Sequence, residues 1–181
     1  MNHRMLRASL ILCIITLFLA AGVDSHAGDG VQTAGDVITA ILPAVAGGMI
    51  LGLKDGDGAW QLAESGALTL GATYGLKYTI NEKRPNGESH SFPSAHSSVS
   101  FASAEYIRKR YGWEFGIPAY ALASFVAYSR VESDQHYAHD VIAGAAIGIA
   151  SSYLFTRPYQ GWHIKVEADP GYYGIRLSRT W

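Results

Sequence analysis

Long runs of apolar residues, separated by short polar stretches, occupy most of this chain and predict α-helices. The run over residues 37–53 is uncharged and has the length of either a buried core helix or a minimal bilayer span. A second run contains Gln61 and Glu64, which a lipid-facing helix would accommodate only at a cost. The pattern predicts an all-α bundle of five helices, over residues 37–53, 59–79, 94–110, 115–128 and 138–155.

The C-terminal residues follow a different pattern. Residues 164–167 and 174–179 alternate apolar and polar positions, and Asp169-Pro170-Gly171 between them is a turn sequence. A period of two is typical of strands, so we expect a short β-hairpin. The sequence thus predicts a helical domain over residues 28–158 and a hairpin tail over residues 159–181.

The N-terminal segment has the layout of a secretory signal peptide. Arg4 and Arg7 precede an uncharged stretch over residues 8–23, and Ser25-His26-Ala27 offers a small-x-small cleavage site. We expect residues 1–27 to be removed, and the alternative is an uncleaved membrane anchor. Either form directs the chain to the cell envelope. The single cysteine, Cys13, lies in this segment, so the processed chain would have no thiol for a disulfide or a metal site.

Composition narrows the range of partners. The formal net charge is −1 and no basic run occurs, so the sequence indicates no nucleic-acid partner. Apolar residues make up 49% of the 181 positions and charged residues 16%. These values lie between those of a soluble helical protein and those of a polytopic membrane protein.

Polar residues of unusual kinds gather in three short stretches, each at a predicted helix end. Each stretch has an ordinary explanation by itself: a solvated helix terminus, an N-terminal cap, or a His–Asp pair at a helix start. The stretches are Lys77 with Arg84-Pro85, then Phe92-Pro93-Ser94-Ala95-His96-Ser97, and then Ser129-Arg130 with His136 and Asp140.

Taken together, the three stretches supply the groups that phosphoryl transfer needs. Backbone N–H groups at a helix start bind anions, and Ser94 stands at such a start. If His136 and Asp140 share a helix start, their spacing of four puts them on one face, where the carboxylate can fix the imidazole tautomer. The three cations would neutralise the charge on the phosphate oxygens, and the guanidinium group of an arginine can donate two parallel hydrogen bonds to such oxygens.

The order and spacing of these residues resemble the signature of the type 2 phosphatidic acid phosphatase superfamily, whose fold is shared with the vanadium-dependent haloperoxidases. The family pattern is Lys-six-Arg-Pro, then Pro-Ser-Gly-His, then Ser-Arg-five-His-three-Asp. All spacings fit between Lys77 and Asp140, and with the flanking helices the resemblance covers about residues 37–155. One departure is Ala95, which stands at the family's glycine. Alanine keeps the backbone N–H, and only a positive φ would make its methyl group costly.

Carried over by position, the resemblance implies a metal-independent phosphatase with a phosphohistidine intermediate. His136 would be the nucleophile, Asp140 would orient it, and His96 would protonate the leaving oxygen and then activate water. The groups that would hold the phosphate are Lys77, Arg84, Ser94, the Ala95 amide and Arg130. The resemblance implies no cofactor. Expected substrates are phosphate monoesters or diphosphates, above all lipid phosphates such as phosphatidate or undecaprenyl diphosphate, which makes a membrane surface or bilayer an expected partner.

Other functions stay open at this point. Soluble exported acid phosphatases belong to the same family, and a haloperoxidase would bind vanadate in the same pocket, although this chain is short for that branch. A membrane scaffold or transporter without catalysis would explain the apolar content but not the intact set of His96, His136 and Asp140. A zinc site that combines His139 with His136 and Asp140 would leave the three cations unexplained.

The sequence is compatible with two locations. We expect an exported, periplasmic protein, soluble or loosely membrane-associated, because Gln61, Glu64 and Glu105 stand in helices that lipid would otherwise surround. The alternative is an integral protein with six spans, of which the uncleaved N-terminal segment is the first. Arg108-Lys109-Arg110 would then face the cytoplasm, and all three motifs would share the outer side.

Overall fold

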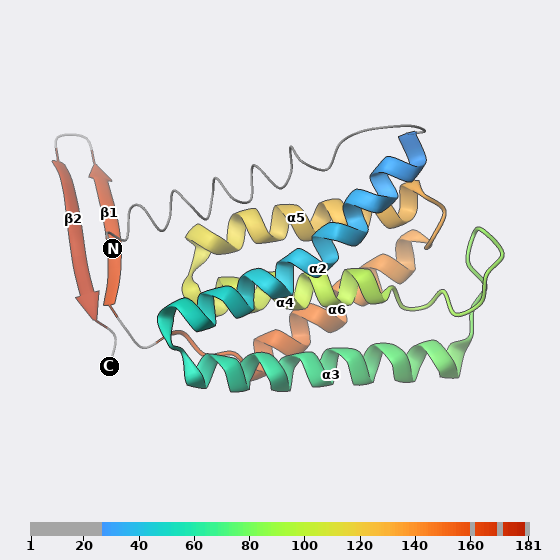
Figure 1. Cartoon of the computed structure of the whole chain (residues 1–181), viewed down its shortest axis with the longest axis horizontal. Coiled ribbons are helices and arrows are strands. Elements are labelled where there is room, and N and C mark those ends of the chain that lie inside the picture. Colours follow the sequence, from blue (N-terminus) through green and yellow to red (C-terminus); the bar gives the residue numbers. More distant parts are fainter. Residues whose placement is uncertain (1–26, 160–161, 170–171, 180–181) are drawn as a thin grey trace.

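The computed structural model describes residues 27–159, 162–169 and 172–179. In this part of the chain, five helices form a bundle, which confirms the all-α architecture (Figure 1). The helices are α2 (Ala27–Leu53), α3 (Gly56–Ile80), α4 (Ala95–Tyr111), α5 (Trp113–Glu132) and α6 (Ala138–Phe155). The predicted signal segment, residues 1–27, lies outside the described residues except for Ala27.

Caps fix the ends of the helices that flank the loop over residues 81–94. α3 ends at Ile80 and is capped by Asn81, which adopts a left-handed backbone conformation and donates its N–H to the Lys77 carbonyl. α4 begins after Ser94, whose hydroxyl oxygen accepts a hydrogen bond from the Ser97 N–H. Because one loop joins these two ends, the motif residues of α3 and α4 meet at the same end of the bundle.

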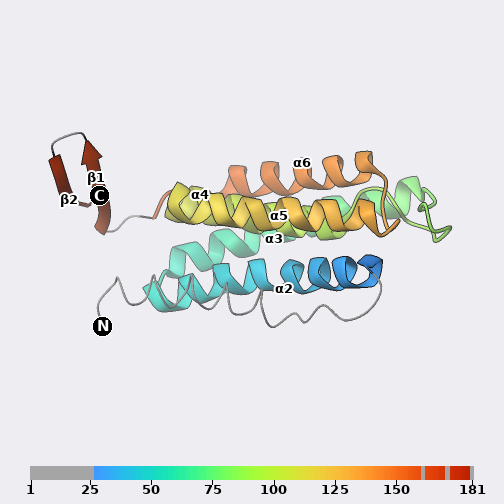
Figure 2. The same cartoon turned by 90° about the horizontal axis from the view of Figure 1, so that it is seen from above.

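α4 is the central helix. It packs against each of the other four helices, α2 also packs on α5, and α3 also packs on α6. Figure 2 shows α2 and α6 on opposite sides of the α4–α5 pair. Every other helix of the bundle therefore shares an interface with α4.

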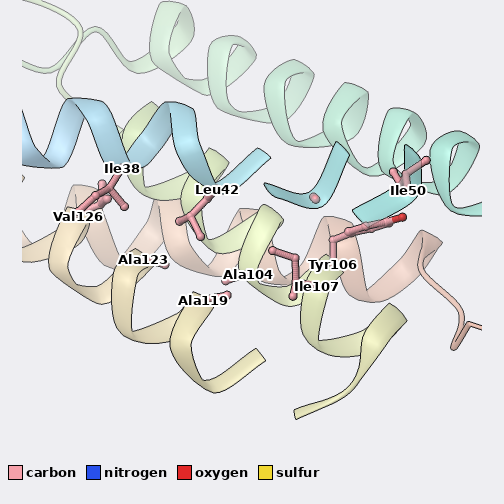
Figure 3. Close-up of a cluster of buried hydrophobic side chains, with 10 residues drawn as sticks. Ile38, Leu42, Ile50, Ala104, Tyr106, Ile107, Ala119, Ala123 and Val126 are labelled. Carbon is pink, nitrogen blue, oxygen red and sulfur yellow. The ribbon is translucent and has the colours of Figure 1, made fainter. Parts of the chain in front are cut away.

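The largest buried apolar cluster lies between α2, α4 and α5 (Figure 3). Its large buried side chains include Leu42 of α2, Tyr106 and Ile107 of α4, and Val126 of α5. Alanines fill the spaces between them and let the helices approach closely; these are Ala46, Ala104, Ala119 and Ala123.

α6 approaches α4 through two glycines spaced four residues apart. A methyl group on Gly144 would lie 2.4 Å from the Ser94 carbonyl oxygen, and one on Gly148 would lie 2.2 Å from the Ser98 carbonyl oxygen. The Ser152 hydroxyl continues this contact by donating to the Ala102 carbonyl at 2.7 Å. Small residues at such spacing are typical of closely packed helices in membranes. The contact fixes the start of α6 against the start of α4.

Outside the apolar cluster, the interior of the bundle is rich in polar side chains, and many large apolar side chains lie on its surface. Small hydroxyl residues fill much of the interior, and Thr73 of α3 donates to Ser98 of α4 at 2.9 Å where both are fully buried. Large apolar side chains instead cover the outside, among them Trp60, Leu70, Tyr78, Ile142, Tyr153 and Leu154. By length and composition, α2 over Gly30–Leu53 and α6 are apolar enough to cross a membrane.

After α6, the chain forms two strands, β1 (Trp162–Asp169) and β2 (Tyr172–Arg179). They pair antiparallel, with Trp162 opposite Arg179 and Asp169 opposite Tyr172. The division into a helical domain and a separate tail remains a prediction.

Candidate active site

The three sequence stretches lie together at one end of the bundle. The end of α3, the loop 81–94, the start of α4, the last turn of α5 and the turn before α6 all reach this end (Figure 1). Backbone hydrogen bonds join them: the Ser94 N–H donates to the Asp140 carbonyl at 3.0 Å, and the His136 N–H donates to the Arg130 carbonyl at 3.1 Å. The second and third motifs are thus held in one rigid unit.

His136 and Asp140 form a buried pair. His136 Nδ1 lies 3.4 Å from Asp140 Oδ2, and the two side chains are 3% and 0% exposed. The Ser91 hydroxyl donates to Asp140 Oδ2 and also lies 3.4 Å from His136 Nδ1. Asp140 Oδ2 accepts a further bond from the Tyr137 N–H at 3.0 Å, which holds the carboxylate at the start of α6. With Nδ1 on the Asp140 side, Nε2 is the ring nitrogen available for reaction.

His136 is kept neutral by its surroundings. Burial lowers the pKa of His136 to about 4, from its ordinary value of 6.5, and the positive charges of Arg84 and Lys77 act in the same direction. Asp140 opposes them and raises the pKa. An imidazole that is neutral at physiological pH carries the lone pair that a nucleophile needs.

Two of the three predicted cations lie on the His136 side of the site. Lys77, itself 7% exposed, donates from Nζ to the His90 carbonyl at 2.6 Å and to the Ser91 carbonyl at 3.3 Å. Arg84 Nη1 donates to Gln135 at 3.1 Å and to Glu88 at 3.0 Å. Arg84 Nε is buried and has no hydrogen-bond partner among the described residues, so it is a donor that an anion would satisfy.

The third cation and the second histidine meet on a carboxylate from α2. Arg130 Nη1 donates to Asp36 Oδ1 at 2.6 Å, and His96 Nε2 lies 3.0 Å from the same oxygen. Arg84 interacts electrostatically with both histidines and so connects the two halves of the site. Asp36 lies outside the three motifs that the sequence shows.

Ser94 and Ala95 lie at the start of α4, as predicted. Ser94 is fully buried and caps the helix, and Ala95 is the first helical residue. Ala95 is not among the described residues with a positive φ, so the methyl group in place of the family's glycine causes no backbone strain. The unpaired N–H groups of the first turn can therefore bind an anion here as they would with glycine.

Comparison with known proteins agrees with this geometry. The sequence model of the PAP2 superfamily matches residues 58–163, more than half of the chain. The chain belongs to the PAP2 superfamily. It is a PAP2-family phosphatase.

PAP2 relatives resemble the chain over most of its length. It is 31% identical to the lipid A 4'-phosphatase of Helicobacter pylori over 166 residues, which are 81% of this chain and 83% of the relative. It is also 31% identical to the lipid A 1-phosphatase of Porphyromonas gingivalis over 140 residues, 71% of this chain and 30% of that longer protein.

Solved PAP2 structures share the fold. Aquifex aeolicus LpxE matches with a TM-score of 0.61 at 19% identity, over 77% of this chain and 92% of that one. A transmembrane PAP2-type phosphatidylglycerolphosphate phosphatase from Bacillus subtilis matches with a TM-score of 0.55 at 24% identity, over 81% and 84%. The family match over residues 58–163 and the 31% identity to the Helicobacter pylori phosphatase confirm the resemblance to the superfamily that the three motifs indicated.

His139 takes part in a different arrangement from the zinc site considered above. Its Nε2 lies 3.0 Å from Glu82 Oε1 and 3.2 Å from Asp140 Oδ1. Among the described residues, Glu82, His139 and Asp140 have ligand atoms close enough together to hold a metal ion. His136 does not belong to this group. The cations Lys77 and Arg84 act on the neighbouring His136, and they would repel a metal ion bound beside them. The donor set therefore fits an ion pair better than a metal centre.

Proposed function

We propose that this PAP2 phosphatase hydrolyses lipid phosphates through a phosphohistidine formed on His136. The observation that carries the proposal is the buried, neutral His136 beside Asp140, with Lys77 and Arg84 close enough to act on its charge. A phosphate dianion in this position would satisfy the buried Arg84 Nε. Phosphoryl transfer depends mainly on positioning and charge neutralisation, and both are supported here.

The reaction would proceed in two steps. In the first, His136 Nε2 attacks phosphorus in line, the bond to the leaving oxygen breaks, and His96 gives its proton to that oxygen. In the second, His96 takes a proton from water, the water oxygen attacks phosphorus, and the phosphorus–nitrogen bond breaks. Inorganic phosphate leaves and His136 is regenerated. The cations and the first-turn amides of α4, among them that of Ala95, would hold the non-bridging oxygens in both steps.

The relatives favour a particular class of lipid. The lipid A phosphatases named above come from two bacterial genera, and one of them matches most of this chain at 31% identity. We therefore propose that the substrate is a phosphate group of lipid A. Lipid A replaces phosphatidate and undecaprenyl diphosphate as the leading candidate. The latter two become comparison substrates.

We further propose that the bundle works embedded in a membrane. The large apolar side chains on the outside, such as Leu154 at 71% and Ile142 at 69% exposed, would lie against lipid tails. Serine and threonine would face inward, where other helices satisfy them. This favours the integral alternative over the soluble exported form expected from the sequence.

The test is release of inorganic phosphate by the purified full chain in lipid–detergent micelles. The panel is lipid A, phosphatidate, undecaprenyl diphosphate and a soluble sugar phosphate. We expect lipid A to be the best substrate, activity to survive EDTA, and orthovanadate to inhibit as a mimic of the five-coordinate transition state. A preference for the soluble ester would favour a broad-specificity acid phosphatase. Bromination activity with vanadate would favour a haloperoxidase.

A further inference from the structure

α2 adds a fourth stretch to the site, outside the three sequence motifs. Its contribution is the carboxylate of Asp36, whose Oδ1 lies 2.6 Å from Arg130 Nη1 and 3.0 Å from His96 Nε2. Asp36 is 94 residues from Arg130 in the sequence and lies before residue 58, where the match to the PAP2 family model begins. None of the roles implied by the family pattern falls on it.

The contact between α2 and the site is close. Arg130, 2% exposed, also donates from Nη2 to the Gln32 carbonyl at 2.6 Å. Gly35 makes the approach possible, because a methyl group there would lie 2.0 Å from Ser129 Oγ and 2.6 Å from Arg130 Nη2. The backbone next to Asp36 is therefore held in place by a buried guanidinium, and the carboxylate position follows from it.

We propose that Asp36 is a positioning residue for His96. Asp36 and His96 would then form a second Asp–His pair, in addition to that of Asp140 and His136. A carboxylate on Nε2 fixes the ring orientation and leaves Nδ1 to face the leaving oxygen. It also stabilises the protonated imidazole, which is the form that donates a proton. Arg130 holds the carboxylate in turn, so that one guanidinium serves both the phosphate and its proton donor. This inference rests on the proposed acid role of His96.

A different role for the same carboxylate would be that of a competitor. Asp36 would then occupy Arg130 in the resting enzyme and leave when a phosphate arrives. The two roles differ in what they affect: a competitor changes substrate affinity, whereas a positioning residue changes proton donation in the chemical step. His96 at 3.0 Å from the carboxylate favours positioning, because competition would need only the contact with Arg130.

The experiment compares Asp36→Asn with wild type in the full chain on two substrates. One is the lipid phosphate, whose alkoxide leaving group needs a proton, and the other is an aryl phosphate with an activated leaving group. We expect kcat/KM on the lipid phosphate to fall at least about tenfold, and kcat/KM on the aryl phosphate to change less than about threefold, because kcat/KM reports the first step, in which His96 acts as an acid. In a His96→Ala background, Asp36→Asn should have no further effect on either substrate.

Asp57→Asn is the matched control, since Asp57 is an exposed carboxylate in the first turn of α3, at the other end of the bundle. It should leave kcat on both substrates unchanged, and the midpoint of thermal unfolding should be the same for all variants. Equal losses on the two substrates, a lower KM without a change in kcat, or an added loss in the His96→Ala background would each overturn the inference. A wild-type chain that releases no phosphate from either substrate would instead refute the proposed function, and the inference with it.

Discussion

His136 is the residue on which the proposed chemistry depends most directly. Replacing it by alanine removes the atom that binds phosphorus, so turnover should fall by at least about three orders of magnitude. Asp140→Asn should keep the fold and substrate binding but lower kcat by about 10²- to 10⁴-fold, because the amide no longer fixes the productive tautomer. The measurements are phosphate release and acid-labile labelling of the protein by a ³²P-labelled substrate.

His163→Ala, a substitution in β1, is the control for the loss of an imidazole as such and should be fully active. Retention of near-normal activity by His136→Ala would refute the phosphohistidine mechanism. So would wild-type labelling that is stable in acid, because phosphohistidine is hydrolysed under those conditions.

The lowered pKa of His136 makes a prediction about pH. The neutral imidazole attacks, and burial with two nearby cations lowers its pKa to about 4. The reactive form therefore persists as pH falls below 6.5, and kcat/KM should decline on the acid side only as pH approaches about 4. The profile is measured from pH 3 to 9 and corrected for ionisation of the substrate phosphate. An acid-side decline centred between pH 6 and 7 would show that His136 titrates as an ordinary exposed imidazole does.

The three motifs are predictable at the residue scale because each combines a helix end with a fixed local spacing. Ser91 and Asp36 are not, although both contact motif residues. Ser91 is one of several serines in its region, and its hydroxyl reaches Asp140 across 49 positions of sequence. Such contacts depend on how helices pack, and no local pattern marks them.

The two glycines of α6 make a prediction at the scale of the helices. Gly148→Ala would place a methyl group 2.2 Å from the Ser98 carbonyl and 2.7 Å from the Ala102 N, both of which are backbone atoms that move only with the helix. We expect a loss of about 1–3 kcal/mol in stability. Because α6 carries Asp140 at its start, activity should fall together with stability.

Gly71→Ala in α3 is the matched control. Nothing lies within 4 Å of a methyl group at this position, so the substitution should be neutral or stabilise α3 by up to about 1 kcal/mol. Thermal unfolding in detergent measures both variants. Equal effects of the two substitutions would mean that α6 does not pack on α4 as described.

The apolar pattern of the sequence predicts where the helices lie, but it does not predict the true ends of two of them. The sequence predicts a helix over residues 115–128, yet the corresponding α5 continues to Glu132 and carries Arg130 in its last turn. α2 likewise begins at Ala27, about ten residues before its uncharged run. Both extensions are polar and hold each other, since Arg130 binds Asp36 and the Gln32 carbonyl. These hydrogen bonds between α2 and α5 stabilise the polar turns at the helix ends. The apolar pattern of either segment alone does not show them.

At the scale of the whole molecule, the structure favours a lipid environment for the bundle, whereas the sequence favoured an aqueous one. The soluble form was expected because Gln61, Glu64 and Glu105 stand in apolar helices. Glu105 is 2% exposed and accepts two hydrogen bonds from Arg108, each 2.6 Å long, and Gln61 accepts one from the Arg157 N–H. Partners within the chain therefore satisfy Glu105 and Gln61, and these two side chains do not exclude a lipid environment.

Membrane embedding predicts how the full chain fractionates. Alkaline carbonate removes proteins bound to a membrane surface but not those that cross it. We expect the chain to stay in the carbonate-washed membrane pellet and to need detergent for extraction, because the outside of α3 and α6 is largely apolar. Release of the chain by carbonate, in active form, would support the soluble or loosely bound protein that the sequence analysis favoured.

The orientation in the membrane follows from charge at the two ends of the bundle. Arg108, Lys109 and Arg110 close α4 at the end opposite the site, and in the proposed membrane-embedded bundle the positive-inside rule predicts that this end faces the cytoplasm. Ser89, in the site loop, and Glu114, at the start of α5, are both exposed and mark the two ends. In a Cys13→Ser background, Ser89→Cys should react with a membrane-impermeant maleimide in right-side-out vesicles, and Glu114→Cys only in inside-out vesicles. The reverse pattern would place the site on the cytoplasmic face, where it would meet substrates of the inner leaflet.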